Sequence, residues 1–313
     1  MTSTPPPSHP PIPLTFCKSA LPLRLWDWGA TLDDAPPVVF VHGFLDAGRS
    51  WAAVANGVRD FCRPLALDWR GHGESGRAIG GASYHQYDHL KDLTRLMDEL
   101  HAEALANNTP PPRTLVAHSM GASIALLCAG LAPEMLDHLI ILDNLGGFAK
   151  DAVDNIDRWA EVLDSVRKPK KAFRIYASKE DAARHVQENN PQMTTIGIDR
   201  FLAASLVPVQ GSTGFEFQFD RELRGPNPLS FPESHWLELC KRVTAKVHVL
   251  IPEFGFFAQH NSPMQTRLQT LRDGESTWLK DTSHHVHVDR PDAVAKVLWQ
   301  ALKPVNTSRN RCD

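Results

Sequence analysis

Short apolar runs recur along the chain, and segments of helical composition lie between them. Runs that are partly β-branched and bounded by turn residues predict buried strands. Because helices separate these strands, the connections are crossovers, and the pattern predicts an α/β fold: a mostly parallel central sheet with helices on both faces. The predicted strands occupy residues 38–41, 64–67, 115–117, 139–142, 247–251 and 277–279.

The same pattern predicts two long helices and an opening pair of strands. Apolar residues recur at helical spacing over 87–105, which predicts an amphipathic helix packed on the sheet. Pro291 precedes a second periodic segment and suits the first turn of a closing helix. Strands over 13–16 and 23–28 are expected to pair at the edge of the sheet.

The alternation of strands and helices stops between Leu142 and Val247. This stretch contains polar segments of helical composition at 152–166, 178–189 and 197–206 and ends in a Gly- and Pro-rich run. We therefore predict an inserted, mainly helical cap. The expected organisation is a disordered Pro-rich N-terminus over 1–12, an α/β core over 13–145, the cap over 146–236, the rest of the core over 237–303, and a flexible tail over 304–313.

Composition narrows the class of protein and of partner. The chain has 313 residues, 42% of them hydrophobic, which is enough for a sizeable core. Its formal charge of −3 creates no strong field toward nucleic acid or anionic membrane. The five cysteines are scattered without C-x-x-C spacing, so neither a disulfide framework nor a structural zinc site is predicted. We find no targeting segment or membrane-spanning run and expect a cytoplasmic protein without membrane insertion.

The segment Ala117-His118-Ser119-Met120-Gly121 places a serine on a predicted strand-to-helix corner. N–H groups at the start of a helix lack helical partners, so at such a corner they can stabilise an oxyanion. The spacing approximates the G-x-S-x-G nucleophile elbow, with Ala117 in place of the first glycine. A serine at this position can equally serve only as a helix cap, so the segment alone leaves both roles open.

Two loops are expected to supply an oxyanion hole. A predicted strand runs into His42-Gly43-Phe44, where the glycine permits a sharp turn toward the serine corner. The backbone N–H groups of Phe44 and Met120 would then act as the two donors. We expect His42, Gly43 and Gly121 to support these turns rather than to react.

An activated serine needs a base, and the base needs an orienting carboxylate. Asp143 directly ends an apolar strand, where an unused charge would be costly, so we favour it and keep Glu253, at a later strand, as the alternative acid. For the base, the loop before the last helix contains His284, His285 and His287. Without a partner carboxylate motif, three loop histidines are weak evidence for a metal, and no metal is predicted.

In this order, the HGF, DWRGHGES, AHSMG and LDN segments and the late histidine loop resemble the α/β-hydrolase superfamily over about residues 13–303. The segments HGFLDAGRSW, LIILDN, FEFQFDRELR, AKVHVLIPEFGFF and HHVHVDRPDAVA are most similar to the serine hydrolase-like proteins. The resemblance implies an α/β-hydrolase fold. It also implies an acid after the strand that follows the nucleophile helix, which is Asp143, and a base seven residues before Pro291, which is His284.

The activity that the resemblance implies is acyl transfer by Ser119, without a cofactor, on a small-molecule substrate. We expect cleavage of carboxylic esters, or of thioesters, of a small apolar substrate. Two alternatives stay open: a non-hydrolytic or C–C bond-cleaving enzyme of the same fold, and a ligand-binding protein without turnover.

Overall fold

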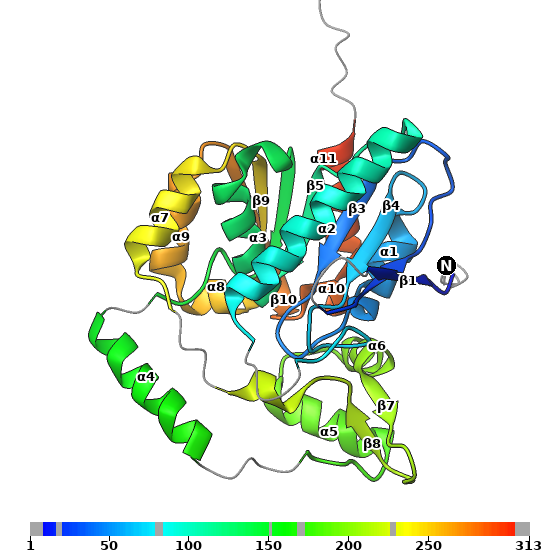
Figure 1. Ribbon diagram of the computed structural model, residues 1–313, viewed down its shortest axis with the longest axis vertical. Coiled ribbons are helices and arrows are strands. Elements are labelled where there is room, and N and C mark those ends of the chain that lie inside the picture. Colours follow the sequence, from blue (N-terminus) through cyan, green and yellow to red (C-terminus); the bar gives the residue numbers. More distant parts are fainter. Residues whose placement is uncertain are drawn as a thin grey trace, which may run out of the picture.

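A computed structural model of the chain describes residues 9–16, 21–78, 84–149, 152–167, 173–225 and 230–303. An eight-stranded sheet in the order β1-β2-β4-β3-β5-β6-β9-β10 forms its core (Figure 1). From β4 to β10 the neighbours in this order pair in parallel, whereas β1 and β2 are antiparallel at one edge. The strands are β1 (Ile12–Phe16), β2 (Leu23–Asp27), β3 (Pro37–Val41), β4 (Arg63–Leu67), β5 (Thr114–His118), β6 (His138–Leu142), β9 (Lys246–Phe254) and β10 (Gly274–Ser283).

The prediction of a mostly parallel sheet with an antiparallel opening pair is confirmed. Strands β9 and β10 are longer than predicted, because both continue past their apolar centres into polar ends. Residues 1–8 and 304–313, which cover most of the expected disordered N-terminus and the whole expected tail, lie outside the described residues.

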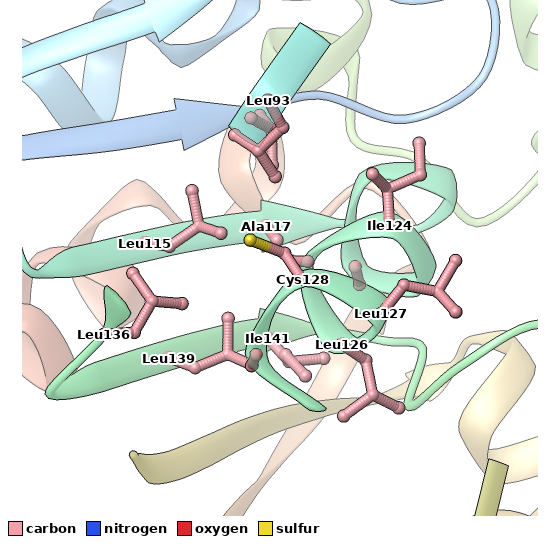
Figure 2. Close-up of a cluster of buried hydrophobic side chains, with 14 of the residues drawn as sticks. Leu93, Leu115, Ala117, Ile124, Leu126, Leu127, Cys128, Leu136, Leu139 and Ile141 are labelled. Carbon is pink, nitrogen blue, oxygen red and sulfur yellow. The ribbon is translucent and has the colours of Figure 1, made fainter. Parts of the chain in front are cut away.

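Helices cover both faces of the sheet because successive strand side chains point to opposite sides. Val39 and Leu115 belong to one buried cluster, and Val38 and Val116 belong to the other. Figure 2 shows side chains of β5, β6, α2 and α3 meeting in the first cluster. The helices of the first face are α2 (Gln86–Asn107), α3 (Met120–Leu131), α7 (Glu233–Arg242) and α9 (Asn261–Thr270); those of the second are α1 (Ala52–Val58) and α11 (Pro291–Leu302).

The chain between β6 and α7 forms a separate group of elements at one end of the core (Figure 1). Its helices are α4 (Ala152–Arg167), α5 (Lys179–Asn189) and α6 (Thr195–Ser205), each close to a predicted helical segment. A small hairpin of β7 (Leu206–Pro208) and β8 (Phe215–Phe217) was not predicted, because strands of three residues show no clear periodicity. Helix α7 begins inside the range predicted for the cap, yet it packs on α3 and α9 of the core.

Short elements complete the fold around the ends of the strands. In the described part of the chain, no helix combines the length and apolar character that crossing a membrane requires. The short elements are the 3-10 helices η1 (Gly48–Trp51), η2 (Pro133–Met135) and η3 (Arg221–Arg224), and the helices α8 (Phe256–Gln259) and α10 (Val286–Asp289).

Candidate active site

Ser119 occupies the junction between β5 and α3, as the sequence predicts. Its backbone has φ 52° and ψ −116°, a conformation that is uncommon outside glycine and that recurs at functional sites. The corner is tight: a Cβ on Gly121 would lie 2.6 Å from the carbonyl oxygen of His42, so glycine is required there. The Ser119 side chain makes no capping hydrogen bond to α3, which contradicts the alternative role as a helix cap.

His284 lies between Ser119 and Asp143. Its Nε2 is 3.0 Å from Ser119 Oγ, and its Nδ1 is hydrogen-bonded to Asp143 Oδ2. Because a carboxylate only accepts, Nδ1 carries the proton, and the lone pair on Nε2 faces the serine hydroxyl. This tautomer is the one in which an imidazole can remove a proton from serine.

The Asp143 carboxylate is fully buried and held from several sides. Its backbone adopts a left-handed φ of 62°, which aspartate tolerates better than most residues, directly after β6. The amides of Phe256 and Phe257, at the start of α8, donate to its two oxygens at 2.7 and 3.0 Å. These bonds orient the carboxylate toward His284.

Gly255 is a residue of this site that the sequence reasoning missed. A Cβ on Gly255 would overlap the Asp143 carboxylate. The signal was present, since a glycine directly follows β9 and precedes α8. Glu253, the alternative acid, accepts instead from the amide of Asp281 at 2.8 Å, and no bond to His284 is found among the described residues.

We predict that Gly255→Ala lowers kcat/KM for a soluble ester by about 10- to 100-fold, because displacing Asp143 misorients the imidazole. Gly255 has φ −104° and ψ 178°, which alanine adopts easily, so the effect is steric. Steady-state kinetics and a thermal melt measure it. Gly57→Ala is the matched control, since a Cβ there makes only an ordinary contact with Ala295. Equal rates in both variants would contradict the prediction.

The loop after β3 lies directly against the serine corner. A Cβ on Gly43 would lie 3.1 Å from Ser119 Cβ, so the glycine permits this close approach. Among the described residues, no acceptor is found for the N–H groups of Phe44 and Met120, the two predicted oxyanion donors. His42 supports the loop: its Nδ1 donates to Gly43 O at 2.7 Å, and its Nε2 accepts from the Trp69 amide at 3.1 Å.

Comparison with known proteins agrees with this geometry. A profile described as the alpha/beta hydrolase family matches residues 38–297. The chain belongs to this family. It is 25% identical to a serine hydrolase-like protein of Danio rerio, over 90% of this chain and 85% of that one. It is 28% identical to the sn-1-specific diacylglycerol lipase ABHD11 of Mus musculus, over 92% of each chain.

The fold also agrees with solved structures of alpha/beta hydrolases and of proteins without an assigned role. The crystal structure of the hypothetical protein PA1622 from Pseudomonas aeruginosa PAO1 matches with a TM-score of 0.79 and 26% identity, over 93% of this chain and 97% of that one. The family and the fold inferred from sequence motifs are therefore both confirmed.

The other two histidines of this hydrolase's loop serve as anchors. His287 Nε2 donates to Asp46 Oδ2 at 3.1 Å, and His285 Nε2 donates to Asn190 Oδ1 at 3.2 Å. Burial alone would raise the pKa of Asp46, but the hydrogen bond from His287 and the nearby histidines lower it to about 2. Donor atoms of Asp46, His118 and His287 lie within 4.8 Å of one another, a spacing that a cation could use. His287 and Asp46 are hydrogen-bonded to each other and His118 is bonded to the His284 carbonyl, so we assign the three residues a supporting role.

The segment between β6 and α7, which the sequence predicts to be a cap, is tied to the histidine loop by a buried carboxylate. Asp289 accepts from the amide and the hydroxyl of Thr194, the N-cap of α6, at 3.0 and 2.6 Å. The same carboxylate accepts from the hydroxyl of Ser283, the residue before His284. Arg200 of α6 donates to Val288 O at 2.6 Å. The sequence reasoning missed these contacts because they join segments far apart in the chain.

Proposed function

We propose that this chain is a serine hydrolase that cleaves carboxylic esters with Ser119 as nucleophile, His284 as base and Asp143 as orienting acid. The observation that supports it most is the pair of bonds made by one imidazole, to Ser119 Oγ and to Asp143. Such a serine, base and acid arrangement converts a weakly nucleophilic hydroxyl into an attacking group.

In the proposed reaction, Ser119 Oγ attacks the ester carbonyl carbon while His284 Nε2 takes its proton. The N–H groups of Phe44 and Met120 stabilise the oxyanion of the tetrahedral intermediate, a contribution of about 3 kcal/mol for each donor. As the intermediate collapses, His284 gives the proton to the leaving alcohol and an acyl-enzyme remains. Water, deprotonated by His284, then attacks the acyl-enzyme, and the acid leaves as Ser119 recovers its proton.

An apolar acyl group is favoured by the aromatic side chains beside the base. The Phe256 ring lies 4.4 Å from the His284 ring, and the Phe148 ring lies 5.5 Å from Phe256. Phe148 is 49% exposed and contacts Phe256, so apolar rings extend from the surface to His284. ABHD11, a relative by sequence, is named as a lipase of diacylglycerol, which is an ester with apolar acyl chains.

Labelling with a small fluorophosphonate tests the proposal, with peptide mass spectrometry to locate the adduct. We expect an adduct on Ser119 that is lost in Ser119→Ala. Ser123→Ala is the matched control, because Ser123 is buried in α3 and accepts from Asn144 Nδ2, so labelling should persist. Absence of an adduct on folded native protein would favour a ligand-binding role. An adduct without turnover of p-nitrophenyl esters would favour the C–C bond-cleaving alternative.

A further inference from the structure

His118, the residue before the nucleophile, joins the two halves of the candidate site. Its Nε2 donates to the backbone carbonyl oxygen of His284 at 2.9 Å. The carbonyl only accepts, so Nε2 carries the proton of the ring. The side chain is buried, and its ring centroid lies 4.6 Å from that of His284. A single side chain therefore connects the end of β5 to the loop that carries the base.

The opposite edge of the His118 ring lies against the loop after β3. A Cβ on Gly43 would lie 2.8 Å from His118 Nδ1, so any larger residue at position 43 would displace the imidazole. Nδ1 has no hydrogen-bond partner among the described residues. The ring is thus confined between Gly43 on one side and His284 on the other, with Ser119 as its chain neighbour.

The surroundings of His118 keep it uncharged. Burial, together with the neighbouring His284, His287 and His285, holds its pKa well below the usual 6.5. A neutral ring does not repel the positive charge that His284 gains when it takes the proton of Ser119. A lysine or arginine could donate the same hydrogen bond, but its charge would oppose protonation of the base.

We propose that His118 is a positioning residue that holds the His284 backbone, and so keeps the imidazole aligned between Ser119 and Asp143. This inference rests on the proposed function, because it concerns the same base. The proposal gives a role to the residue directly before the nucleophile. Neither the reaction scheme nor the oxyanion hole uses this residue.

Three variants test the role: His118→Leu, His118→Gln and, as matched control, His89→Leu. His89 is also a buried histidine, but its ring contacts Trp69 and His72 rather than His284. The measurements are kcat, KM and the pH profile of kcat/KM with p-nitrophenyl acetate. The titratable groups that contact His284 are Asp143, His118 and His285, and Asp143 is unchanged in every variant.

We expect His118→Leu to lower kcat about 10- to 100-fold, because the catalytic His284 is misplaced. The KM should stay within about threefold of the native value. The pH profile of kcat/KM should change as well, because a loosened imidazole interacts less with the Asp143 carboxylate. His118→Gln, whose amide can donate to the same carbonyl, should recover most of the rate. His89→Leu should keep the native rate and pH profile, whatever it costs in stability.

Two results would overturn the role of His118. One is a rate and pH profile in His118→Leu that match those of His89→Leu, and the other is equal loss in His118→Gln and His118→Leu. Failure of the proposed function has a different signature: the native protein would form no adduct with the fluorophosphonate and would hydrolyse no ester. That result would overturn both proposals together.

Discussion

Replacing Asp143 with asparagine is expected to lower kcat/KM for a soluble ester by about 10⁴-fold, the loss typical when the orienting acid of a Ser-His-Asp site becomes an amide. The amides of Phe256 and Phe257 donate to the two side-chain oxygens of Asp143. The Phe256 amide and His284 Nδ1 share Oδ2, whereas the Phe257 amide donates to Oδ1. The asparagine NH₂ group therefore faces the Phe257 amide in one orientation, and both the Phe256 amide and His284 Nδ1 in the other. An NH₂ group facing Nδ1 favours the tautomer that protonates Nε2, and this tautomer cannot accept the serine proton. Steady-state kinetics at pH 8, with circular dichroism to confirm folding, measure the effect.

Glu253→Gln is the control that separates the two candidate acids. The Glu253 carboxylate accepts from the Asp281 amide, and a glutamine oxygen can accept the same bond. We therefore expect Glu253→Gln to stay within about twofold of the native rate. A large loss in Glu253→Gln together with a small one in Asp143→Asn would show that the assignment of the acid is wrong.

The sheet and its main helices could be predicted from the sequence because burial imposes a regular spacing of apolar residues along the chain. Residues of β3 and β5 are apolar on both faces, since helices cover both sides, and this produces the short uninterrupted apolar runs. Ser119 could be predicted for a related reason: it stands where a strand pattern changes to a helix pattern. Where local pattern decides local structure, prediction from one sequence succeeds.

The remaining features depend on contacts between distant segments. Gly255 is required because it packs against Asp143, which follows β6 and lies more than a hundred residues earlier in the chain. Thr194 precedes α6 and Asp289 lies in α10, so they are far apart in the chain, and neither lies in a periodic pattern that marks it. Chain order and resemblance to a family predict the site residues. The glycines and carboxylates that support those residues can be recognised only from the packing of the folded chain.

A marked loss of stability in mild acid is expected from the buried histidines. Burial lowers the pKa of His89 to about 3 and holds those of His72 and His118 well below the usual 6.5. Between these values and 6.5 the unfolded chain binds more protons than the folded one, so stability falls as pH decreases below 6.5. His89 alone contributes about 1.4 kcal/mol per pH unit in this range, or about 2 kcal/mol from pH 7 to pH 5. His72 and His118 act in the same direction and add to this loss, which is compared with a typical total stability of about 5–15 kcal/mol.

Urea unfolding at pH 7.5, 6 and 5 measures this loss, and His89→Gln identifies its source. Asp68 acts in the opposite direction, since burial raises its pKa, but only near its own titration range. In the His89→Gln variant, unfolding should take up about one proton fewer than in the native protein. The free energy of unfolding should therefore change less steeply with pH, by about 1.4 kcal/mol per pH unit, whatever the stability of the variant at pH 7.5. An unfolding free energy that stays constant from pH 7.5 to 5 in the native protein would mean that these histidines are not held neutral. The same result would weaken the argument that His118 can lie 4.6 Å from His284 without opposing protonation of the base.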